Sequence, residues 1–143
     1  MEPQAHEELS KLSDYARQNF SHAYMSDTKW RKFFAVIRES GVELVRASVK
    51  FIDVDEPKQI LFNDHWPDVR TDACLDTFDF GVMAFREIEW LEFPDVALIQ
   101  RREFGSPEKV HQDLKPIQEA LEAAGQFPLE LTGDALRLVA YRS

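Results

Sequence analysis

The 143-residue sequence contains one cysteine, five glycines and no long apolar run. Because Cys74 has no partner within the chain, an intrachain disulfide is excluded and a reducing compartment is expected. The first residues lack the charged and apolar regions of a secretory signal, and no apolar run approaches the roughly 20 residues of a membrane helix. The glycines form neither a phosphate loop nor a dinucleotide fingerprint. We therefore expect a cytoplasmic protein without membrane association and without a cofactor.

Motifs of metal or nucleophilic chemistry are also lacking. The four histidines stand in no zinc-binding spacing, and no Gly-x-Ser-x-Gly elbow occurs. The nearest approach to a metal site is segment 63–68, which contains Asp64, His65, Trp66 and Asp68. His65 and Asp68 could share an ion there, and Asp53 and Asp55 could add oxygen ligands. A polar loop whose carboxylates make turn hydrogen bonds explains the same residues. We predict that no metal is bound specifically.

Positive charge is scarce in the middle of the sequence. The net charge is −9, and segment 53–95 alone carries −9, because it holds three bases and twelve acids (3 − 12). Such an excess repels nucleic acid and attracts basic partners, although a surface that only aids solubility is the alternative. We predict no nucleic-acid binding, and we expect most of these carboxylates to form one contiguous negative surface.

The spacing of apolar residues predicts the secondary structure. Helical spacing predicts helices over residues 5–20, between Ser26 and Gly41, and from Ser106 to Gly125, with Pro116 as a kink or break in the third. Residues 72–85 fit either period. Alternation of apolar and polar residues predicts strands over residues 45–51, 58–62, 86–93, 96–102, 129–132 and 135–142.

The order of these elements predicts the fold class. Strands occur in hairpin pairs and helices are grouped, which is typical of an α+β fold with a mostly antiparallel sheet and helices packed on one face. No repeat, low-complexity tract or linker interrupts the sequence. We therefore expect residues 1–143 to form a single globular domain with residues 1–4 frayed.

Three glutamates lie close together in the predicted strand 86–93. If Ile88 and Trp90 share one face, Glu87 and Glu89 share the other, about 7 Å apart by strand rise. Such a pair could serve acid–base chemistry, and a solvated or edge-protecting face is the alternative. No residue is assigned as catalytic. The candidate binding residues are Asp64, His65, Trp66, Asp68, Glu87, Glu89, Trp90 and Glu92.

Three stretches carry a resemblance to a known family. They are Asp27-Thr28-Lys29-Trp30, Arg86-Glu87-Ile88-Glu89-Trp90-Leu91 and Leu136-Arg137-Leu138-Val139-Ala140-Tyr141-Arg142. The sequence resembles a family of small bacterial cytoplasmic proteins known only as a domain of unknown function. The resemblance implies no catalytic residue, because none is assigned to that family.

Two functions remain open on this reading. The first is a non-enzymatic interaction protein, similar to an antitoxin or immunity protein, that binds a basic partner through its acidic segment. The alternative is a small-molecule-binding or hydrolytic domain that uses the carboxylates of residues 64–92. A concave pocket lined by Glu87, Glu89, Trp66 or Trp90 favours the alternative, whereas a flat acidic face with Trp66 exposed favours the interaction protein. The sequence indicates no oligomeric state.

Overall fold

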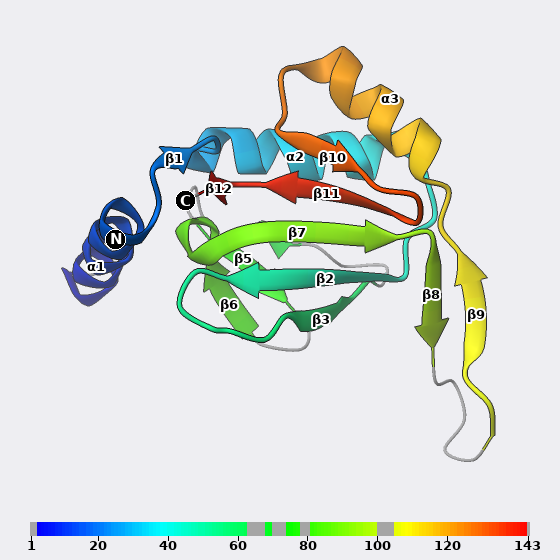
Figure 1. Ribbon diagram of the computed structural model, residues 1–143, viewed down its shortest axis with the longest axis horizontal. Coiled ribbons are helices and arrows are strands. Elements are labelled where there is room, and N and C mark those ends of the chain that lie inside the picture. The colour runs from blue at the N-terminus through cyan, green and yellow to red at the C-terminus, as the bar shows by residue number, and fades with distance from the viewer. Residues whose placement is uncertain (1–2, 63–67, 70–73, 78–80, 100–104, 143) are drawn as a thin grey trace.

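The computed structural model describes residues 3–62, 68–69, 74–77, 81–99 and 105–142 (Figure 1). Its helical elements are α1 (Pro3–Asn19), α2 (Asp27–Ser40), η1 (Phe85–Glu87) and α3 (Leu114–Ala124). Its strands include β2 (Arg46–Phe51), β3 (Lys58–Leu61), β7 (Ile88–Pro94), β8 (Val96–Ile99), β9 (Glu108–His111) and β11 (Ala135–Val139). The other described strands are β1 (His22–Ala23), β4 (Asp68–Val69), β5 (Cys74–Thr77), β6 (Gly81–Ala84), β10 (Leu129–Leu131) and β12 (Tyr141–Arg142). The fold is α+β, as predicted.

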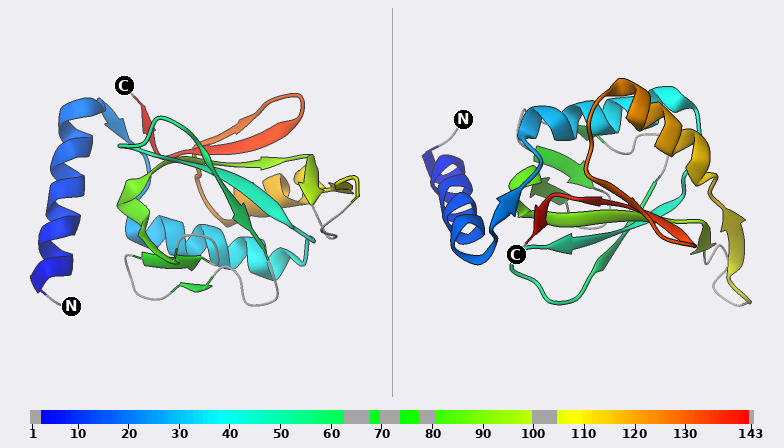
Figure 2. Two further views of the ribbon diagram at one scale, coloured as in Figure 1. Left: turned by 90° about the horizontal axis from the view of Figure 1, so that it is seen from below. Right: turned by 45° about the horizontal axis from the view of Figure 1, so that its top comes forward.

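A five-stranded sheet in the order β10-β11-β7-β2-β3 forms the centre of the molecule, and its neighbouring strands pair antiparallel. Helices α2 and α3 and the small sheet β4-β5-β6 lie on one side of it, whereas α1 stands beyond one end (Figure 2). The prediction that helices pack on one face is therefore confirmed for α2 and α3. Helix α1 lies outside that layer.

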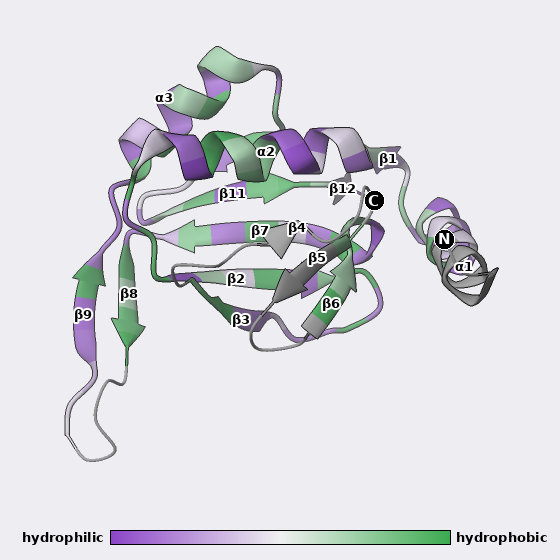
Figure 3. Cartoon of the chain, turned by 180° about the vertical axis from the view of Figure 1, so that it is seen from behind, coloured by the Kyte–Doolittle hydropathy of each residue, from purple (hydrophilic) through white to green (hydrophobic). Residues whose placement is uncertain are grey.

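Helix α2 begins and ends where the sequence indicates. The Ser26 hydroxyl accepts a hydrogen bond from the Lys29 amide at 3.1 Å, which is an N-cap, and Gly41 follows the helix with a φ of 71°. Between these ends the helix alternates hydrophilic and hydrophobic bands (Figure 3). The buried residues of the helix are Trp30, Phe33, Phe34 and Ile37.

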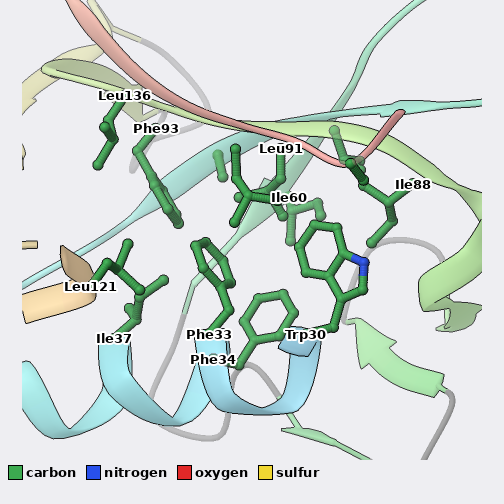
Figure 4. Close-up of a cluster of buried hydrophobic side chains, with 14 of the residues drawn as sticks. Trp30, Phe33, Phe34, Ile37, Ile60, Ile88, Leu91, Phe93, Leu121 and Leu136 are labelled. Carbon is green, nitrogen blue, oxygen red and sulfur yellow. The ribbon is translucent and has the colours of Figure 1, made fainter. Parts of the chain in front are cut away.

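The core lies between α2 and the inner face of the five-stranded sheet (Figure 4). Phe33 is fully buried, and its ring lies 5.2 Å from that of Phe34 and 6.2 Å from that of Phe93 on β7. Trp30 stacks on Phe34 and on Phe85 of η1. Ile117 and Leu121 of α3, both fully buried, complete this cluster. The aromatic stripe predicted from helical spacing is thus the main hydrophobic contact of the fold.

The third helix begins later than predicted. Residues around Ser106 and Pro107 carry helix-start signals, but Glu108–His111 forms strand β9, which pairs antiparallel with β8. In this hairpin Val110 lies opposite Ala97, which is buried. The local capping signals are therefore outweighed by pairing with β8, the preceding strand. Helix α3 starts at Leu114, after Asp113, so Pro116 occupies the third helical position.

The later start of α3 removes the reason for the kink or break predicted at Pro116. The first four amides of a helix have no intrahelical acceptor, so a proline there forfeits no hydrogen bond. We expect Pro116→Ala to change the free energy of unfolding by less than about 1 kcal/mol, because the gain in helix propensity and the loss of chain stiffness nearly cancel. Urea unfolding followed by circular dichroism measures this, and a change above about 2 kcal/mol would contradict the assignment.

Gln112 joins the β8–β9 hairpin to the central sheet. Its side chain is 2% exposed. The Oε1 atom accepts from the amides of Val45 (2.7 Å) and Arg46 (3.1 Å). The Nε2 group donates to the carbonyls of Arg46 (3.1 Å) and Pro94 (2.7 Å). One buried amide thereby satisfies four backbone groups where β2 begins and β7 ends.

The segment 72–85, which fits either period in the sequence, contributes strands. Its described residues form β5 and β6, which pair with each other, and β4 adds a third strand. Cys74 on β5 is half-buried. Within the described residues, no helix combines the length and apolar character that a bilayer-spanning segment needs.

Candidate functional site

The outer face of the five-stranded sheet, opposite α2 and α3, has no described helix over it (Figure 1). Strand register aligns one row of polar residues across this open face: Gln59, Ser48, Glu92, Arg137 and Glu130. Gln59 donates to the Ser48 hydroxyl at 2.9 Å, and Arg137 Nε donates to Glu92 Oε1 at 3.2 Å. The open face is therefore a connected polar layer rather than a set of independent charges.

A bulge in β7 decides which residues reach this face. Lys50 pairs with Trp90 while Phe51 pairs with Ile88, so Glu89 is an extra residue on β7. The alternation shifts there, and Trp90 points outward while Ile88 is fully buried. The prediction that Ile88 and Trp90 share one face is wrong for this reason. The inward-facing residues of β7 are Ile88, Leu91 and Phe93.

Trp90 and Arg137 form the centre of the open face. The Cζ atom of Arg137 lies 3.9 Å from the centroid of the Trp90 ring, which is a cation–π contact. Arg137 also pairs with Glu92, through its NH2 group at 3.1 Å. The guanidinium is thus held between an aromatic ring and a carboxylate, which fixes a planar, charged surface in one orientation.

A hollow of about 300 Å³ opens beside this stack, between the sheet and the end of α1. Glu89, which pairs with Lys50 at 3.8 Å, forms part of its wall, and Arg142 pairs with Glu130 at its rim. The hollow is lined by Phe20, Glu89, Trp90, Glu130, Arg137, Val139, Tyr141 and Arg142. It combines aromatic rings with charges of both signs.

Glu87 does not join Glu89 and Glu92. It lies in η1, before the strand, and its Oε2 atom accepts a hydrogen bond from the Ala84 amide at 2.7 Å. The predicted pair of Glu87 and Glu89 on one strand face is therefore wrong. Of the predicted site residues, the structure brings together Glu89, Trp90 and Glu92 on the open face.

The predicted loop site is only partly described. Asp64, His65 and Trp66 lie outside the described residues. Asp68 lies on β4 opposite Asp76 of β5, in the small sheet on the helix side of the central sheet. It is therefore separated from Trp90 by the central sheet. Among the described residues, no group of three or more His, Cys, Asp or Glu side chains is placed to hold a metal ion.

Pairing across the sequence also alters the expected negative surface. Glu89 and Glu92 pair with Lys50 and Arg137, which come from outside segment 53–95, and Glu87 makes the backbone hydrogen bond described above. Residues outside segment 53–95 therefore supply cations to its carboxylates. A separate group of exposed acids lies in the loop between β2 and β3, at the end of the sheet near the hollow (Figure 1). We call this the acidic loop, and its members are Asp53, Asp55 and Glu56.

A larger cleft, of about 650 Å³, lies between α1, the start of α2, η1 and β12. Arg86 of η1 enters it: its NH1 group donates to the Ser13 hydroxyl at 3.1 Å, and its NH2 group lies 3.5 Å from Asp27 Oδ2. The Tyr141 hydroxyl donates to the Arg86 carbonyl at 3.1 Å. Burial raises the pKa of Tyr141, with Arg86 lowering it and Asp27 raising it, so this phenol stays a proton donor at neutral pH.

Sequence reasoning missed this cleft. The polar residues of its lining, among them Ser13, Asp27, Arg86 and Tyr141, span most of the chain, and no short motif joins them. One signal was present in the sequence. The three stretches by which the sequence resembles a known family supply Asp27, Arg86 and Tyr141, one each, and the fold brings them to the same cleft.

Comparison with known proteins gives one match. The model of a family of unknown function, DUF6678, matches residues 12–143, a range that includes every residue lining the cleft. No curated protein and no solved structure matches the sequence. Since the match covers nearly the whole chain, the protein belongs to the DUF6678 family, whose function is unknown.

Proposed function

We propose that the protein is a non-enzymatic interaction protein, similar to an antitoxin or immunity protein, that binds a basic protein partner through the open face. The observation that carries this proposal is the Trp90–Arg137 stack on a sheet face that no described helix covers. Trp, Tyr and Arg are the residue types that supply most binding energy in protein interfaces. Here Trp90 and Arg137 are held rigid before binding, and Tyr141 lies at the edge of the same hollow.

Charge supports a basic partner. The ion pairs of Glu89, Glu92 and Glu130 largely cancel within the open face. The acidic loop adds three exposed carboxylates at one end of it, and none of them has an ion-pair partner among the described residues. The net charge of −9 attracts a basic protein over a longer range and repels nucleic acid. The single cysteine and the family resemblance support placing this function in the bacterial cytoplasm.

The alternative function uses the carboxylates of residues 64–92 for hydrolysis or small-molecule binding. The hollow beside Glu89 and Trp90 is the observation in its favour, although about 300 Å³ is at the lower limit for ligand pockets. Glu89 and Glu92 are already held in ion pairs with Lys50 and Arg137, so the geometry supports ligand binding better than hydrolysis.

Site-specific crosslinking tests the proposed surface. A photoreactive benzoylphenylalanine at position 90 should crosslink one basic protein in cells of the source organism, whereas the same group at position 119, on the exposed side of α3, should not. The crosslinked protein is then purified and its binding to the unmodified chain is measured. Identical crosslinking patterns at both positions, or failure of the purified proteins to bind, would contradict the proposal.

For that partner we predict a strongly salt-dependent association rate. Changing the acidic loop to Asp53→Asn, Asp55→Asn and Glu56→Gln should slow association by roughly tenfold at low salt, because these carboxylates steer the encounter. The matched control changes three exposed acids on the helix side, Glu39→Gln, Glu119→Gln and Glu122→Gln, and should have a much smaller effect. Surface plasmon resonance at several salt concentrations measures both rates. Equal slowing by the two variants would show that only net charge matters.

A further inference from the structure

The cleft beneath α1 is separate from the open face. The rings of Phe20 and Tyr141, 5.4 Å apart, form a wall that lines the cleft on one side and the hollow on the other. The cleft volume of about 650 Å³ lies well inside the range of roughly 300–1,000 Å³ that is typical of small-molecule sites. We propose that this cleft binds a zwitterionic ligand, namely a free amino acid or a dipeptide with an apolar side chain.

The charged groups of the cleft match such a ligand. The Arg86 guanidinium is 40% exposed and the Asp27 carboxylate 21% exposed, so both are accessible to a ligand. Their separation of 3.5 Å is longer than the 2.7–2.9 Å that is usual for strong charged hydrogen bonds. A ligand carboxylate can therefore accept two N–H bonds from Arg86, while its ammonium group reaches Asp27. In a free amino acid the two charged groups are attached to one carbon atom, which matches the close spacing of the two protein charges, whereas in a dipeptide they lie one residue further apart.

Hydroxyl groups surround this pair. The Ser13 hydroxyl on α1 already accepts from Arg86, and Ser26 lies at the start of α2 beside Asp27. Tyr141 holds the Arg86 backbone from the opposite side through its hydrogen bond to the carbonyl. Arg86 is thus oriented by a helix, by a strand and by an ion pair, which reduces the entropy lost when it binds a ligand.

Apolar side chains complete the site. Met25 and Phe20 line its walls, and the buried rings of Trp30 and Phe85 form its base. Apart from the indole N–H of Trp30, these groups offer no hydrogen bond to an uncharged polar substituent, so they favour an aliphatic or aromatic side chain. The ligand class follows from this combination: opposite charges at one end and an apolar group at the other.

The test uses L-leucine and two analogues that each lack one charge, 4-methylpentanoate and 3-methylbutylamine. Isothermal titration of the wild-type chain should show saturable binding of L-leucine or of L-leucyl-L-leucine, and roughly tenfold weaker binding or none for each analogue. Which of the first two binds more tightly distinguishes an amino acid from a dipeptide. Equal affinity for the analogues, or no binding of either zwitterion at millimolar concentration, would overturn the proposal. Because this comparison uses the unmodified protein, it does not depend on any variant folding.

Variants then locate the site. Arg86→Gln should weaken binding by roughly tenfold or more, and Arg86→Lys should restore part of it, because charge returns without the two-pronged geometry. The control Arg38→Gln, on the exposed side of α2, should leave the affinity unchanged. Amide shifts in the NMR spectrum should appear at Ser26 and Arg86 and be absent from β2. Shifts confined to the open face would place the ligand there and would contradict the cleft as its site. Failure of the proposed partner surface is a separate result, which the crosslinking experiment measures.

Discussion

Replacing Trp30 with alanine should lower the free energy of unfolding by about 3–5 kcal/mol. Trp30 is 2% exposed, and its ring lies within 6.1 Å of the rings of Phe33, Phe34 and Phe85. Truncation removes the largest buried side chain of α2 and leaves a cavity between α2 and η1, which rigid aromatic neighbours cannot fill. Chemical denaturation, analysed by linear extrapolation, gives the free-energy difference directly.

Trp90 provides the matched control for this prediction. The same substitution at Trp90 removes a half-buried ring from the open face, where solvent can occupy the vacated space. We expect Trp90→Ala to cost less than about 2 kcal/mol, although it should abolish binding of the purified partner. An equal loss of stability at the two positions would mean that the open face is part of the core, and would contradict the assignment of β7 residues to its two faces.

Replacing Gln112 with methionine is expected to be nearly as severe, with a loss of about 3 kcal/mol or more. Methionine has a similar length and fills the space, but it neither donates nor accepts the four backbone hydrogen bonds of Gln112. The abandoned amides and carbonyls are partly buried, so each loses its partner and gains little water in exchange. Faster hydrogen exchange at the amides of Val45 and Arg46 should accompany the loss.

The control for Gln112 is Gln126→Met, at an exposed position after α3. Substitutions at such positions usually change stability by no more than about 0.5 kcal/mol. If the two variants unfold at the same denaturant concentration, the hydrogen bonds of Gln112 contribute little and the β8–β9 hairpin must be held by its own pairing.

Elements with strong local signals could be predicted from the sequence. Helix α2 has a serine cap, a glycine terminator and four apolar residues at helical spacing, and all three agree with the structure. The α3 stripe of Leu114, Ile117 and Leu121 was also recognisable. Its start was not, because β9 owes its conformation to hydrogen bonds with β8 rather than to its own residues.

The candidate site was less predictable, for two physical reasons. The outward orientation of Trp90 depends on the bulge at Glu89. This bulge is set by the pairing of β7 with β2, and the alternation of residues within β7 alone gives no information about that pairing. The cleft depends on residues between Ser13 and Tyr141 that meet only after the chain has folded. Ion pairs could not be predicted for the same reason, because it is strand register that places Glu92 opposite Arg137.

The pairing of β1 with β12 joins two distant parts of the chain. The Ser21 amide donates to the Arg142 carbonyl at 2.9 Å, and the Tyr24 amide donates to the Ala140 carbonyl at 2.8 Å. The sequence from Ser21 to Arg142 therefore closes into a ring, with its first and last residues side by side. Such a ring suits circular permutation: a short linker can connect these residues, and new chain ends can be opened at the surface loop between β2 and β3. Helix α1 then becomes an appendage that can be attached, moved or omitted without interrupting the central sheet.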